Sequence, residues 1–122
     1  MGYGLKELAT VADLDAAVSA SATQPILIYK HSLTCGTSGM AYEELLDVVT
    51  GSMLPGTAFM VTIQTARGVS RAIEERLRIR HESPQVLLVS EGRVVWHASH
   101  FRVTARRIAA ALQAVSSEHA GK

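Results

Sequence analysis

Residues 25–35, PILIYKHSLTC, decide the architecture of this chain. The first six form a nearly continuous apolar run that is rich in isoleucine and ends in polar residues, as is typical of a central strand covered on both faces. After His31-Ser32-Leu33-Thr34, apolar spacing predicts a helix from Cys35 to about Val49, followed by a turn over residues 51–56. The predicted inward side chains of this helix are Met40, Leu45, Val48 and Val49. Cys35 therefore lies where a strand ends and a helix begins.

The segments on either side repeat this alternation of strands and helices. Upstream, residues 5–8 predict a short strand and residues 11–21 a helix, at whose start Thr10 and Asp13 form a capping box. Downstream, residues 57–63 predict a second buried strand, and Ser70 is predicted to cap the helix that follows it. The predicted buried face of that helix holds Val69, Ile73 and Leu77.

The last third of the chain predicts a hairpin and a closing helix. Residues 85–89 and 93–97 read as strands joined by Ser90-Glu91-Gly92, a connection short enough to make them antiparallel. Residues 104–115 predict an amphipathic helix with Ile108, Ala111, Leu112 and Val115 inward, before a frayed tail at 116–122. The order β-α-β-α-β-α-β-β-α is that of the thioredoxin fold, a three-layer α/β/α arrangement around a mixed sheet. We expect residues 1–122 to form one such domain.

Composition limits the classes of function. The chain has 122 residues, of which 48% are hydrophobic, with 12 Lys and Arg against 11 Asp and Glu, so it shows no electrostatic footprint for nucleic acid or an anionic membrane. No segment approaches the roughly 20 apolar residues of a membrane span, and the first residues do not resemble a secretory signal. We expect a cytoplasmic protein. Its single cysteine cannot form a disulfide within the chain, so a redox role must use a bond to another molecule.

The predicted position of Cys35 favours a reactive thiolate. Backbone N–H groups and the partial positive charge at a helix start both stabilise a thiolate relative to a thiol. Lys30 and His31 lie just upstream and would add positive potential, although strand alternation leaves open whether either side chain faces the sulfur. An accessible thiolate attacks disulfide sulfur at neutral pH. The alternative is a small buried hydrophobic residue, which the flanking polar residues Thr34, Gly36, Thr37 and Ser38 disfavour.

Two further positions complete the predicted site. Ser38 stands one helical turn after Cys35, where a dithiol oxidoreductase carries its second cysteine, so Cys-Gly-Thr-Ser is a monothiol version of Cys-x-x-Cys. A serine can donate a hydrogen bond to the thiolate but cannot resolve a mixed disulfide; the alternative is a merely polar residue in the first turn. Ser83-Pro84 directly precedes a predicted strand, and a cis peptide there, as in the thioredoxin fold, would place Pro84 against the cysteine. The alternative is an ordinary trans proline.

Residues 29–41 (YKHSLTCGTSGMA) resemble the signature of the monothiol bacilliredoxins, the YtxJ-like family with a thioredoxin fold. Residues 80–85 (RHESPQ) and 92–100 (GRVVWHASH) resemble two further stretches of the same family. The resemblance implies removal of bacillithiol, a low-molecular-weight thiol, from thiolated partner proteins by way of Cys35. It implies no tightly bound cofactor, a monomer or weak dimer, and a site lined by Lys30, His31, Ser38, Ser83 and Pro84.

Two other functions stay open from the sequence. Gly36-Thr37 also resembles the Cys-Gly-Phe-Ser of iron–sulfur monothiol glutaredoxins, in which two cysteines and two external thiols hold a cluster, but Thr37 replaces the phenylalanine. The other is a binding module whose cysteine is incidental. His97 and His100 have a metal-like spacing, yet on an extended strand they would point to opposite faces, so we expect no metal site.

A charged segment and two aromatic residues have simpler interpretations. The favoured interpretation of the arginines at 67, 71, 76, 78 and 80, which are interspersed with Glu74 and Glu75, is a solvated helix face. The sharper alternative is that Arg78 or Arg80 binds the carboxylates of a small anionic thiol. Trp96 and Phe101 are expected to pack in the core or at its edge.

Overall fold

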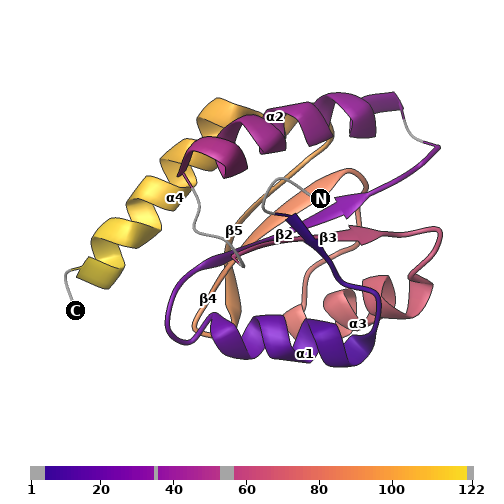
Figure 1. Ribbon diagram of the computed structural model, residues 1–122, viewed down its shortest axis with the longest axis horizontal. Helices are drawn as coiled ribbons and strands as arrows, with labels where there is room; N and C mark the ends of the chain where they lie inside the picture. Colours follow the sequence, from indigo (N-terminus) through magenta and orange to yellow (C-terminus); the bar gives the residue numbers. More distant parts are fainter. Residues whose placement is uncertain (1–4, 35, 53–56, 121–122) are drawn as a thin grey trace.

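The computed structural model describes residues 5–34, 36–52 and 57–120, and Figure 1 shows helices on both faces of a central sheet. The elements follow in the predicted order, with one short 3-10 turn added. They are β1 (Leu5–Glu7), α1 (Val11–Ala20), β2 (Ile26–His31), α2 (Gly36–Ser52), β3 (Ala58–Thr62), α3 (Arg67–Leu77), β4 (Gln85–Ser90), β5 (Arg93–Ser99), η1 (His100–Arg102) and α4 (Ala105–Ala120).

Strand β2 occupies the middle of the sheet. The strand order is β1-β3-β2-β4-β5, in which β1, β3 and β2 run parallel while β4 and β5 run antiparallel to their neighbours. Residues 26–30 of β2 are all buried, because β2 has a strand on each side and helices over both faces. The continuous apolar run in the sequence had predicted this double coverage.

Each face of the sheet has its own hydrophobic core. Helices α1 and α3 cover one face, where Ile26 and Ile28 pack with Leu87 and Ile73. Helices α2 and α4 cover the other, where Leu27 packs with residues that include Leu45 and Ile108. Successive side chains of β2 alternate between these cores, so the strand contributes to both layers. Fully burying each such aliphatic side chain contributes about 1.5–3 kcal/mol.

Local signals in the sequence explain several element boundaries. The Thr10 hydroxyl accepts a hydrogen bond from the Asp13 N–H, and the Asp13 carboxylate accepts one from the Thr10 N–H, each at 3.1 Å, which confirms the capping box. The N–H groups of Ala9 and Thr10 lower the pKa of Asp13. The hairpin turn consists of Glu91 and Gly92, whose φ angles of 53° and 78° match the right-handed twist of the strands. Ser90, predicted in the turn, is the last residue of β4.

Two predictions about helices α2 and α3 are wrong. Met40 is 64% exposed and its neighbour Ala41 is buried instead, whereas Leu45, Val48 and Val49 are buried as predicted. Ser70 does not cap α3 but lies buried within it; the Thr62 carbonyl accepts hydrogen bonds from the N–H groups of Thr65 and Ala66, and the helix begins at Arg67.

Near the C-terminus, one helix is longer than predicted and one prediction is wrong. Helix α4 extends to Ala120, beyond the predicted end at residue 115. Phe101 is 75% exposed because it lies in η1, outside the sheet, whereas Trp96 packs against the α2/α4 core as expected. Within residues 5–34, 36–52 and 57–120, no helix is both long and apolar enough to span a membrane.

Leu87→Ala tests the importance of the central strands. Leu87 is fully buried in β4 opposite Ile28 of β2, so its truncation leaves a cavity and should lower the free energy of unfolding by about 2–5 kcal/mol. Val95→Ala on the outer strand is the matched control. Because Val95 is exposed, this substitution should lower the free energy of unfolding by less than about 0.5 kcal/mol. Urea denaturation measures both, and equal losses would contradict the assignment of the core.

Candidate active site

Most of the predicted site residues lie at one end of the strands, along a single edge of the sheet. The carboxyl ends of β2 and β3 and the amino end of β4 meet there, since Lys30 pairs with Gln85 and His31 with Thr62. The Ser83-Pro84 peptide bond just before β4 is cis, as predicted, and the Pro84 carbonyl accepts a hydrogen bond from the His100 N–H at 2.9 Å. The residues after β2 and the cis-proline segment are therefore brought to the same edge.

Cys35 itself lies outside the described residues, whereas its neighbours Thr34 and Gly36 are described. Gly36 is exposed and is the first residue of α2, a helix of 17 residues. The first N–H groups of such a helix have no partner within it and carry partial positive charge. Thr37, half-buried in the first turn, lines a hollow of about 180 Å³ beside Met40 and Phe101.

Ser38 joins the start of α2 to the end of β2. Its hydroxyl oxygen accepts a hydrogen bond from the Ser32 N–H at 3.2 Å, and both residues are buried. Its carbonyl accepts a second hydrogen bond, from the Tyr29 hydroxyl at 2.9 Å. From the sequence, Ser38 is either a donor to the sulfur or an ordinary polar residue of the first turn. In the structure it is a fixed link between strand and helix, and its hydroxyl can still donate one hydrogen bond.

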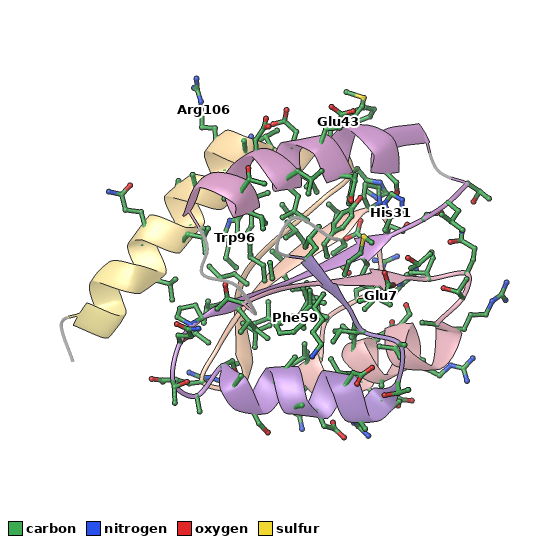
Figure 2. All side chains as sticks on the ribbon, in the orientation of Figure 1. Glu7, His31, Glu43, Phe59, Trp96 and Arg106 are labelled. Carbon is green, nitrogen blue, oxygen red and sulfur yellow. The ribbon has the colours of Figure 1, made fainter. Side chains whose placement is uncertain are left out.

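His31 belongs to an aromatic cluster on the same face of the sheet. Its ring centroid lies 5.5 Å from those of Tyr29 and of Tyr42 of α2, and Figure 2 shows it on the α2 side of the sheet. His31 Nδ1 is 3.0 Å from the Tyr29 hydroxyl. Because that hydroxyl donates to the Ser38 carbonyl, His31 must be the donor in this contact. Burial lowers the pKa of His31, with Glu7 opposing the shift, which favours the neutral ring.

Lys30 points to the opposite face of the sheet. It alternates with His31 along β2 and lies on the side covered by α3, together with Ile28. The side chain is fully buried, and Nζ has no hydrogen-bond partner among the described residues. Burial lowers the pKa of Lys30 to about 8, while the negative charge of Glu74 in α3 opposes the shift. His31 therefore faces α2 and Lys30 faces α3, while the sulfur that either was considered to face lies outside the described residues.

Gln64, which was not predicted from the sequence, organises the segment before the cysteine. Its Oε1 accepts a hydrogen bond from the Leu33 N–H at 3.0 Å, and its Nε2 donates to the hydroxyls of Ser32 at 2.9 Å and Thr34 at 3.4 Å. Residues 32–34 are thus held by one side chain from the link after β3. Its place just beyond a parallel strand, at the edge where site residues gather, was the available signal.

The remaining predicted residues lie farther out. His100 forms a contact of 3.1 Å between Nε2 and Glu82 Oε1, but the described part of the chain contains no group of three or more residues that could hold a metal ion. Arg78 is exposed and ends α3 in a left-handed conformation, and Arg80 is exposed after it. Arg76 forms an ion pair with Asp15 of α1, consistent with a solvated helix face.

Comparison with known proteins identifies the family. Residues 6–108 match the family model described as monothiol bacilliredoxin BrxC. The chain belongs to the monothiol bacilliredoxin family. This thioredoxin-fold family matches the resemblance carried by residues 29–41, 80–85 and 92–100.

Solved structures support the same fold. A thioredoxin-fold protein provisionally assigned as an oxidoreductase superposes with a TM-score of 0.78 at 23% identity, covering 88% of this chain and 92% of the other. Thioredoxin O2 from Arabidopsis thaliana gives 0.72 at 19% identity, with 93% and 95% covered. Thioredoxin from Fasciola hepatica gives 0.71 at 13% identity, with 89% and 97% covered. At these identities the likeness establishes the thioredoxin fold alone.

Lys30→Met tests whether the buried ammonium destabilises the folded protein. Between about pH 8 and 10.5 the unfolded chain keeps a proton on Lys30 that the folded protein has released, so wild-type stability rises with pH in that window. Below pH 8 the penalty is fully present. Methionine has a similar volume and no charge. The free energy of unfolding of Lys30→Met should therefore exceed that of wild type by up to about 3 kcal/mol near neutral pH.

The measurement is urea denaturation of both proteins across that pH window. The advantage of Lys30→Met should shrink as the pH rises toward 10.5. Lys6→Met serves as the control, since Lys6 is exposed on β1 and its variant should parallel wild type. A constant difference between Lys30→Met and wild type would show that Lys30 is not the buried titrating group.

Proposed function

We propose that this protein is a monothiol thiol–disulfide oxidoreductase that removes a low-molecular-weight thiol, bacillithiol by family membership, from protein mixed disulfides. The observation that carries the proposal is a single cysteine directly before the first residue of α2, in a chain of the monothiol bacilliredoxin family. The partners are thiolated proteins and the small thiol, which acts as co-substrate with no tightly bound cofactor. Exchange with such a thiol belongs in the reducing cytoplasm.

The reaction consists of two successive thiol–disulfide exchanges. The Cys35 thiolate attacks the sulfur of the small thiol in the mixed disulfide, and a new disulfide forms between Cys35 and that thiol while the old bond breaks. The target protein leaves as a thiolate and takes a proton from water. A second external thiol then attacks the Cys35 adduct and releases a small-molecule disulfide, so the oxidising equivalent passes from target to small thiol and the free enzyme is regenerated.

The described residues support each part of this role. The start of α2 at Gly36 and Thr37 supplies partial positive charge that favours a thiolate. Ser38 and Gln64 hold the residues on either side of Cys35 in place. The cis Ser83-Pro84 segment at the same edge of the sheet would line the space that the target occupies. Ser38 carries no sulfur, so the adduct on Cys35 has to be released by an external thiol.

Intact mass spectrometry after incubation with a bacillithiolated model protein tests the proposal. Wild type should gain one adduct as the substrate loses its own, and Cys35→Ser should gain none. Ser38→Cys is the informative variant: a thiol one turn after Cys35 should attack the adduct and expel the small thiol, leaving an internal disulfide without external thiol. A wild-type protein that gains no adduct from a substrate that keeps its own would refute the proposed reaction.

A further inference from the structure

A hollow of about 330 Å³ lies on the α3 side of the site, away from the hollow beside Thr37. It opens between the link that follows β3 and the first turns of α3. Its polar lining consists of Gln64, Arg67, Ser70, Arg71, Glu74 and His81. None of these residues was assigned to the site from the sequence, where the arginines of this helix read as a solvated face.

The charges around this hollow favour an anion. Arg67 and Arg71 each bring a guanidinium, whereas Glu74 is the one acidic residue that lines the hollow among the described residues, and its Oε2 already accepts a hydrogen bond from the His81 N–H. Burial and the neighbouring charge of Lys30 lower the pKa of His81, with Glu74 and Glu82 opposing the shift, so His81 is not counted among the cations. The cations therefore outnumber the carboxylate.

Two further groups point to the same kind of ligand. Helix α3, of 11 residues, begins after Ala66 with no side-chain hydrogen bond at its cap, so its first N–H groups have no capping side chain. Behind the lining lies Lys30, fully buried, whose Nζ has no hydrogen-bond partner among the described residues. Lys30 acts electrostatically on Glu74 and His81, and both line the hollow. An anion there would offset a buried positive charge.

The hollow is continuous with the segment that carries the cysteine. Gln64 lines it and at the same time hydrogen-bonds the Leu33 N–H and the Thr34 hydroxyl. Thr34 directly precedes Cys35 in the chain. The residue before the cysteine is therefore held by a side chain that also lines the hollow.

We propose that this hollow binds the carboxylate of the small thiol while that thiol is transferred to Cys35, and so selects carboxylate-bearing thiols over neutral ones. Arg67, Arg71 and the N–H groups at the start of α3 donate to the carboxylate, and Lys30 stabilises it from behind. The inference rests on the proposed function, because it concerns the group that the cysteine removes. It adds the chemical class that the enzyme prefers.

Steady-state kinetics with two matched adducts test the selectivity. One model protein is thiolated with N-acetylcysteine and the other with N-acetylcysteine amide, which differ only in the carboxylate. The double variant Arg67→Gln/Arg71→Gln should raise KM for the carboxylate adduct about tenfold, with kcat unchanged, and leave the amide adduct unaffected. Arg106→Gln is the matched control, since Arg106 is exposed on α4, on the far side of the molecule in Figure 2. Equal KM values for the two adducts in wild type would overturn the proposal.

A binding measurement decides the question independently of catalysis. Unreactive S-methyl-N-acetylcysteine is titrated into Cys35→Ser while backbone amide signals are followed by NMR. The amide signals of residues 64–71 should shift when this compound is added. Its amide and inorganic phosphate should each cause smaller shifts of the same signals. Shifts of equal size with phosphate, or none with the carboxylate, would overturn the inference. If neither adduct is transferred in the kinetic assay, the proposed function fails, whereas these shifts still establish or exclude the carboxylate site.

Discussion

The hydrogen bond from the Ser32 N–H to the Ser38 hydroxyl is the contact on which the arrangement of the site depends. It joins the residue after the central strand to the first turn of α2, across a separation of six positions in the sequence. Both partners are buried, so losing the hydroxyl would leave an unsatisfied N–H at a cost of about 1–3 kcal/mol. Gln64 holds the start of this segment as well, through the Leu33 N–H and the Ser32 hydroxyl. The residues on both sides of the cysteine are thus fixed by polar contacts.

Strand β2 separates two electrostatic environments. On the α2 side, Tyr29 and a His31 ring whose neutral form is favoured make a network that holds the helix start. On the α3 side, Lys30 is a buried ammonium beneath a hollow with two arginines. The alternation of strand side chains produces this division, because adjacent residues of β2 point to opposite faces. One face orients the helix that follows the cysteine, and the other offers positive charge to an anionic group.

The sequence predicted the framework because its signals are local. The apolar run of β2, the capping box at Thr10 and the Gly92 hairpin depend on neighbouring residues alone. The cis bond at Pro84 was expected through the fold, not from the dipeptide. The start of α3 was missed, because hydrogen bonds in the link before it fix where the helix begins. Gln64 was missed for a similar reason, since its partners lie about 30 positions earlier in the chain. Likewise, periodicity shows which face Lys30 occupies but not how completely α3 covers it.

The pKa of the Cys35 thiol tests the central claim most directly. It is read from the ultraviolet absorbance of the thiolate as a function of pH, with Cys35→Ser as the blank. A thiol held before the first N–H groups of α2 should titrate well below the ordinary value of about 8.5, and Ser38→Ala, which loosens the helix start, should move it back toward that value. A wild-type pKa at or above 8.5 would contradict the account, because the sulfur would then gain nothing from the helix that follows it.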